Sequence, residues 1–88
     1  MNEKTYNRLY REITKNFQAN VNHLREERYL TLRDLASLTG YSHSYVVDLL
    51  SREPGHREPS LDAIVRFATA LRTNPLRLLE KNSSAKTK

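Results

Sequence analysis

The chain has 88 residues, the size of one small domain, and it contains no cysteine, which excludes a disulfide framework and a thiolate metal site. It has no run of about 18 apolar residues, which argues against a membrane span, and these features together predict a cytoplasmic protein. The net charge is +5, but residues 17–80 carry eight arginines and eight acidic residues, so the excess lies at the two ends. Net charge is therefore weak evidence for a nucleic-acid partner.

The first predicted element is a helix near the N-terminus. Apolar residues recur at intervals of three and four from Tyr6 to Leu24, with no proline or glycine between them. One helix over about residues 3–28 would be roughly 39 Å long, and two helices with a break near residue 15 are the alternative. We expect residues 1–16 to be an extension that either packs over the core or serves as a dimer contact or a basic arm reaching DNA.

The stretch from Thr31 to Ser51 predicts two short helices around a tight turn. Thr31 can cap the first helix, and Asp34, three residues later, can complete a capping box. Gly40 suits the left-handed residue that ends this helix, and Ser42 can cap the second one. A glycine at the corner allows two helices to cross closely, as in a helix-turn-helix motif.

The two helices of this motif each have a predicted buried face. The inward residues, chosen by helical spacing, are Leu35, Ala36, Leu38, Val46, Leu49 and Leu50. The residues that point outward from the front of the second helix are His43, Ser44, Val47 and Asp48. A helix with such an outer face at its N-terminus can enter a DNA major groove.

The remainder of the chain predicts a loop and two more helices. The loop spans residues 51–59 and contains the strong turn signal Pro54-Gly55. Ser60 then caps a helix whose predicted buried stripe consists of Leu61, Ile64, Val65, Ala68 and Leu71, widened on one flank by Phe67. Asn74-Pro75 starts a short final helix, and residues 81–88 read as a disordered basic tail.

Residues 17–80 resemble the helix-turn-helix family of the phage repressor and Cro proteins. The segment SHSYVVDLL fits the usual recognition helix of the family, and EPSLDAIVRFATALRTNPLRLLE fits its fourth and fifth helices. The resemblance implies an all-α, five-helix, lambda-repressor-like DNA-binding domain with its motif at residues 31–51. The segment 1–16 is then an N-terminal helical extension, and 81–88 is a tail.

The resemblance also implies the residues that meet DNA. The expected base contacts are His43, Ser44, Val47 and Asp48. The expected backbone contacts are Thr31, Arg33, Ser42, Tyr45, Arg52, His56 and Arg57. A histidine can donate to guanine or accept from a base amino group, and an aspartate can accept from cytosine although it repels phosphate. For the loop members of this set, a solvated surface loop is the alternative.

Three positions depart from the family pattern. Tyr29 stands where many relatives have glycine, and a positive φ there would cost about 1 kcal/mol unless the turn has a different shape. Leu32 stands where a phosphate-binding glutamine is usual, so Thr31 or Arg33 takes that role or it is lost. Leu50 replaces a glutamate that often pairs with a helix-1 arginine, which leaves the partner of Arg25 open.

The function implied is sequence-specific binding of double-stranded DNA by a homodimeric transcriptional repressor, typical of phages, plasmids, restriction–modification control or toxin–antitoxin pairs. The operator would be an inverted repeat with half-sites roughly 34 Å apart. The expected dimer surface contains Leu76, Leu78 and Leu79. No cofactor, metal, membrane or small-molecule ligand is expected.

Two other classes of function are the alternatives. A protein-interaction module of the same fold, such as an antitoxin or adaptor, would suit the zero net charge of residues 17–80. An enzyme is disfavoured because the sequence has no nucleophile motif and no glycine-rich phosphate loop. Its three histidines also lie on three different predicted elements, without the spacing of a metal site.

Overall fold

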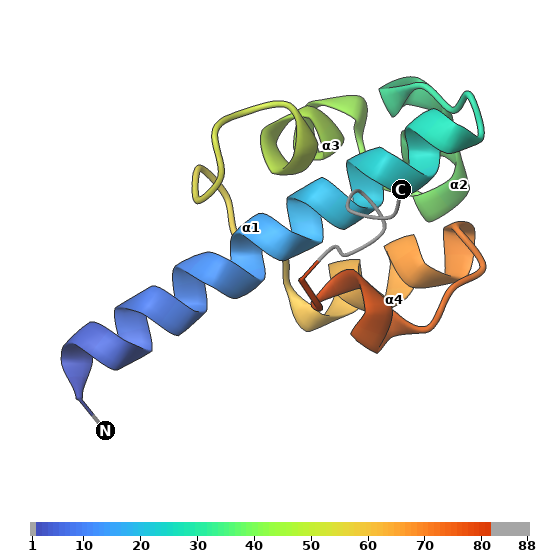
Figure 1. Cartoon of the computed structure of the whole chain (residues 1–88). Helices are drawn as coiled ribbons and strands as arrows, with labels where there is room; N and C mark the ends of the chain where they lie inside the picture. The colour runs from blue at the N-terminus through green and yellow to red at the C-terminus, as the bar shows by residue number, and fades with distance from the viewer. Residues whose placement is uncertain (1, 82–88) are drawn as a thin grey trace.

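The computed structural model describes residues 2–81, which form four α-helices and one 3-10 helix (Figure 1). In chain order the elements are α1 (Glu3–Glu27), α2 (Leu32–Thr39), α3 (His43–Leu50), α4 (Leu61–Ala70) and η1 (Pro75–Leu78). No strand occurs among residues 2–81, which confirms the predicted all-α fold. No helix of this part is long and apolar enough to cross a membrane.

The fifth element differs from the expected α-helix. Asn74 caps it through a hydrogen bond of 2.8 Å from the Leu76 amide, and Pro75 takes the first position as predicted. The segment then makes only a 3-10 turn of four residues. Of the tail predicted for residues 81–88, all but Lys81 lies outside the described residues.

Helix α1 is one continuous helix of 25 residues, so the alternative of a break near residue 15 is wrong. Asn2 caps it by accepting hydrogen bonds from the Lys4 and Thr5 amides at 2.7 and 3.3 Å. The C-terminal half packs against the other helices, whereas the N-terminal half projects beyond them (Figure 1). Most of the extension therefore projects, and only its last residues, such as Thr14 and Asn16, pack against the rest of the chain.

The core lies where α1, α2, α3, α4 and η1 meet, and its two phenylalanines contact each other edge to face. The ring centroids of Phe17 on α1 and Phe67 on α4 are 5.7 Å apart. The other buried apolar residues are Val21, Leu35, Val46, Leu49, Leu50, Ala63, Ala68, Leu71 and Leu78. The predicted inward face of α3 is therefore confirmed in full.

Two predicted buried faces need correction. On α2, Leu38 is exposed and Thr39 is buried instead, because Thr39 lies one helical turn after the buried Leu35. On α4, Leu61 and Val65 are exposed, and Phe67 lies at the centre of the buried face rather than on its flank. The apolar face of α4 is wider than the surface against which it packs, so only one side of that face is buried.

The cap at the start of α2 and the turn between α2 and α3 both form as predicted. The Thr31 hydroxyl accepts from the Asp34 amide at 3.0 Å, and the Asp34 carboxylate accepts from the Thr31 amide at 2.8 Å. Gly40 ends α2 with a φ of 84°, and the Ser42 hydroxyl accepts from the Tyr45 amide at 3.1 Å to start α3. These local contacts fix where α3 begins.

Helices α1 and α4 are each followed, two residues after their last residue, by a non-glycine residue in the left-handed region, with φ of 57° at Tyr29 and 55° at Arg72. Beyond each, the next amide reaches back five residues, from Leu30 to the Arg25 carbonyl at 2.8 Å and from Thr73 to the Ala68 carbonyl at 2.9 Å. Of the two alternatives for Tyr29, the positive φ is therefore the one observed.

Candidate nucleic-acid interface

Helix α3 is held by its buried face and by its C-terminal end. Two amide side chains of α1 bind the last carbonyls of α3, Gln18 to that of Leu49 at 3.2 Å and Asn22 to that of Leu50 at 2.9 Å. These bonds satisfy carbonyls that a helix end leaves without partners. The outer face of α3 is thereby fixed relative to α1, with Ser44 exposed and the other three expected base contacts half-buried.

An open hollow at the front of α3 brings two expected DNA contacts together. Arg33 of α2 and His43 of α3 both line it, and the remaining lining residues are Ala36, Ser37, Gly40 and Tyr41. Thr31 lies at the exposed N-terminus of α2, where its amide and hydroxyl are used in the capping box. The hollow is therefore lined by a cationic side chain, Arg33, as well as by His43, the first residue of α3.

At the rear of α3, Asp48 gathers the three basic residues of the following loop. Its carboxylate oxygens lie 3.5 Å from Arg52 Nε, 3.9 Å from His56 Nε2 and 3.7 Å from Arg57 Nε. The side chain of Asp48 is 24% exposed, while each of the three basic side chains is about half exposed. The structure thus unites one expected base contact with three expected phosphate contacts.

Sequence reasoning did not foresee this cluster. The i, i+4 spacing of Asp48 and Arg52 is a signal that could have suggested their pairing, but the approach of His56 and Arg57 depends on the loop conformation. Pro54 and Gly55 turn that loop, with a φ of 94° at Gly55 and a hydrogen bond of 3.0 Å from the His56 amide to the Glu53 carbonyl.

Two further contacts steady the loop. The Arg57 guanidinium lies 5.2 Å from the centroid of the Tyr45 ring, a cation–π distance. Gln18 of α1 also donates to the Arg52 carbonyl at 2.6 Å. Exposed ion pairs contribute only about 0–1 kcal/mol each, so a phosphate can replace the Asp48 carboxylate as partner of these cations at small cost.

A second cluster, also missed from sequence, ties the turn before α3 to α4. Tyr41 donates a hydrogen bond to the Asp62 carboxylate, which also pairs with Arg66 at 2.8 Å. Arg66 in turn donates to the Thr39 carbonyl at 2.8 Å and lies 5.1 Å from the Tyr41 ring centroid. The i, i+4 spacing of Asp62 and Arg66 is the part that sequence could have revealed.

The charges of this cluster shift two titrations. Partial burial, followed by the hydrogen bond to Asp62, raises the pKa of Tyr41 to about 12. The same hydrogen bond, followed by the Arg66 charge, holds the pKa of the Asp62 carboxyl below its ordinary value. At neutral pH the hydroxyl is therefore protonated and the carboxylate ionised, the pair of states that this hydrogen bond requires.

The three leucines expected at a dimer surface are placed differently from one another. Leu76 is exposed and Leu79 is half-buried, but Leu78 is fully buried in the core of its own chain and presents no surface to a second subunit. Two asparagines of α1 hold this segment. Asn16 donates to the Leu79 carbonyl at 3.0 Å, and Asn20 donates to the Leu78 carbonyl, also at 3.0 Å.

Arg25, whose partner the sequence left open, binds no acidic residue in the described contacts. It donates to the Leu30 carbonyl at 3.1 Å and to the Asn22 side chain at 2.8 Å. Leu50, which stands at the position of the usual glutamate, is buried. The family's arginine–glutamate pair is thus replaced by hydrogen bonds that support the end of α1.

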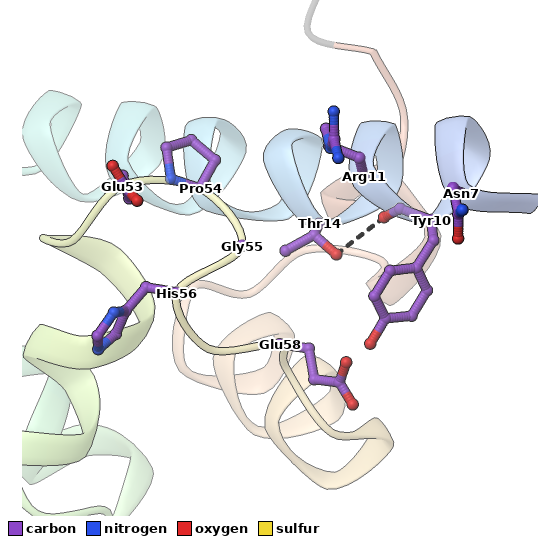
Figure 2. A pocket seen from close by; sticks show the side chains of 9 residues that line it. All are labelled: Asn7, Tyr10, Arg11, Thr14, Glu53, Pro54, Gly55, His56 and Glu58. Carbon is purple, nitrogen blue, oxygen red and sulfur yellow. Dashed lines mark hydrogen bonds between the residues drawn. The ribbon is translucent and has the colours of Figure 1, made fainter. Parts of the chain in front are cut away.

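A cleft separates the loop after α3 from the projecting half of α1, as Figure 2 shows. The α1 side of the cleft is formed by Asn7, Tyr10, Arg11 and Thr14, and the loop side by Glu53, Pro54, Gly55, His56 and Glu58. Thr14 is buried here and its hydroxyl donates to the Tyr10 carbonyl at 2.9 Å. The loop therefore lies alongside α1 while the first turns of α1 stay uncovered.

A family model described as a helix-turn-helix domain matches residues 19–80. Among solved structures, the restriction-modification controller protein C.AhdI from Aeromonas hydrophila is similar, with 36% sequence identity and a TM-score of 0.63. That match covers 72% of this chain and 91% of the other. A comparison with curated protein sequences gave no match.

Proposed function

The chain belongs to the helix-turn-helix family of phage repressor and Cro-like regulators and is a DNA-binding transcriptional regulator, and we propose that it acts as a homodimeric repressor. Each subunit places α3 in a major groove of an inverted-repeat operator, with half-sites roughly 34 Å apart. His43, Ser44 and Val47 read base edges, and Asp48 lies at the end of that row.

The observation that carries this proposal is the distribution of cations around the outer face of α3. Arg33 lines the same hollow as His43 at the front of α3, and Arg52 and Arg57 pair with Asp48 at its rear. Cations that flank a polar helix face can bind the phosphates on either side of a groove while the helix contacts the bases. Thr31, Ser42, Tyr45 and His56 complete the proposed backbone contacts.

The similarity to C.AhdI favours one biological setting among those that the family serves. Because the identity is 36% over 91% of that controller protein, we propose that this chain controls genes of a restriction–modification system. A protein-interaction module, such as an antitoxin or adaptor, is the alternative function. The exposed apolar residues at the start of α1 are the observation that favours it.

A selection experiment tests the proposal. The purified chain is mixed with short duplexes from its own genomic neighbourhood plus nonspecific competitor, and the bound duplexes are sequenced. An enriched inverted repeat is the expected result. A variant with alanine at His43, Ser44 and Val47 should lose the enrichment while keeping its helicity, whereas Thr69→Ala, on an exposed position of α4, should keep both. A folded wild-type chain that enriches nothing would refute DNA reading and favour the protein-interaction module.

A further inference from the structure

The projecting half of α1 carries an apolar stripe that is about half exposed among the described residues. Tyr6 is 53% exposed, Leu9 38%, Tyr10 43% and Ile13 45%, and the two tyrosine rings stack with centroids 5.9 Å apart. These four residues, called the α1 stripe below, precede the family match, which starts at residue 19. An apolar surface gathered on one projecting helix face indicates a binding partner.

We propose that the partner is the α1 stripe of a second copy of this chain, paired antiparallel. The stripe positions 6, 9, 10 and 13 have the same spacing when read from either end. A two-fold axis between residues 9 and 10 therefore sets Tyr6 against Ile13 of the second copy and Leu9 against Tyr10. Such self-complementarity is what a two-fold interface requires.

The charges on α1 permit this pairing. The basic residues of the same helical segment are Lys4, Arg8, Arg11 and Lys15, and all four line one shallow hollow. At 3.6 residues per turn this basic face lies opposite the α1 stripe. Two copies joined through their stripes therefore turn their like charges away from each other. Arg8 is also partly neutralised by Glu12, 3.4 Å away.

The size of the stripe predicts a reversible contact rather than a permanent one. A fully exposed aromatic side chain offers about 200 Å², so two half-exposed tyrosines contribute roughly 200 Å² per copy. With the two aliphatic side chains the pair buries several hundred Å² in total, below the ~1,200 Å² of stable interfaces. Association should therefore depend on concentration and be strengthened when both copies share one DNA duplex.

Pairing through the α1 stripe would also set the distance between the two recognition helices, an argument that rests on the proposed function. The C-terminal end of α3 is bound to α1 at Gln18 and Asn22. That point lies about ten residues, or roughly 16 Å, from the proposed two-fold axis. Along the direction of α1, the two recognition helices would then be roughly 32 Å apart, close to the ~34 Å between half-sites one turn apart.

Disulfide trapping tests the arrangement directly, because the chain has no cysteine of its own. The variants Tyr6→Cys and Ile13→Cys, one of them isotopically labelled, are oxidised separately and as a mixture. We expect the mixed disulfide to form at least tenfold faster than either self-disulfide. Arg11→Cys, on the basic face, is the control and should cross-link with neither. Faster self-disulfides would refute the antiparallel arrangement, and equal rates for all pairs would refute the contact.

Sedimentation without DNA provides the second measurement, so its outcome does not depend on DNA binding. Ile13→Glu should raise the dissociation constant of the dimer at least tenfold, which corresponds to about 1.4 kcal/mol, and should leave the helicity unchanged. Arg11→Gln should leave the constant unaltered. A wild-type chain that stays monomeric at every concentration overturns the proposal. So does a dimer that resists Ile13→Glu but dissociates with Leu76→Glu, which would place the interface at η1.

Discussion

Asp48 of α3 pairs with Arg57 of the following loop, with 3.7 Å between the carboxylate Oδ2 and the guanidinium Nε. The same carboxylate also approaches Arg52 and His56, so a single acidic residue governs every basic side chain of the loop. In the proposed complex this acid has two opposing effects. It keeps the loop cations close to α3, and it offsets the positive charge that DNA phosphates would meet.

The first prediction concerns the charge of Asp48. Asp48→Asn keeps the size of the side chain but frees the loop cations, so affinity for any duplex should rise and the preference for the selected operator should fall. The slope of log affinity against log salt should steepen by about one phosphate contact. Fluorescence anisotropy with operator and scrambled duplexes at several salt concentrations measures both effects.

A matched charge change elsewhere serves as the control. Glu80→Gln frees Arg77, which lies 4.0 Å from Glu80 near η1, and adds the same net charge to the protein. If both variants change the salt slope equally, overall charge rather than the loop position explains the effect. An unaltered slope in Asp48→Asn would show that the loop does not contact phosphate.

A second prediction separates backbone strain from side-chain crowding at glycine. Gly40→Ala should lower the free energy of unfolding by about 1–2 kcal/mol, because φ is 84° and the new Cβ would lie 3.2 Å from Arg66 Nη1. Gly55→Ala has a similar φ of 94° but would meet no atom within 4 Å, so it should cost less. Urea unfolding of both variants gives the comparison, and equal losses would mean that the Arg66 contact is unimportant.

The left-handed ends of α1 and α4 predict a gain of stability. Tyr29 is 90% exposed, so its side chain contributes little packing, while its φ of 57° is strained. Tyr29→Gly should raise the free energy of unfolding by about 0.5 kcal/mol, the relieved strain less the entropy that glycine loses on folding. Arg72→Gly, at a φ of 55°, should behave alike. Thermal unfolding measures both, and a loss at either site would show that the residue contributes other contacts.

The Tyr41–Asp62 hydrogen bond predicts how stability depends on pH. The lowered pKa of Asp62 contributes stability above its ordinary value of 3.8 that is lost as the pH falls through the lower folded value. The raised pKa of Tyr41 contributes stability below 10.0 that is lost as the pH rises through about 12. The wild-type advantage over Tyr41→Phe should therefore be constant between these limits and shrink beyond both. A difference that ignores pH would exclude this hydrogen bond as its source.

Features that depend on neighbouring residues were predictable from sequence. The capping box at Thr31, the left-handed Gly40 and the Ser42 cap each involve residues within about four positions, where side chain and backbone chemistry decide the outcome. The inward residues of α3 followed from spacing for the same reason. These local rules placed the start of the candidate recognition helix correctly.

Features that depend on distant contacts were not predictable in this way. Helical spacing marked both edges of the apolar stripe of α4, but only the packing partner decides that Phe67 is buried and Leu61 is not. Likewise, the family resemblance implied a base contact for Asp48, but nothing in the sequence fixes that Arg57 lies beside this residue. The buried Leu78 was assigned to a surface because a short apolar segment does not reveal which of its sides meets the core.

The amide side chains of α1 connect this helix to two other elements. Gln18 and Asn22 hold the end of α3, while Asn16 and Asn20 hold the segment around η1. A tilt of α1 would therefore shift α3 and η1 together. If pairing through the α1 stripe strengthens operator binding, thermodynamic linkage requires the operator to strengthen pairing by the same factor. Pairing through the projecting end of this helix would then couple the concentration of subunits to the fraction of operator that is occupied.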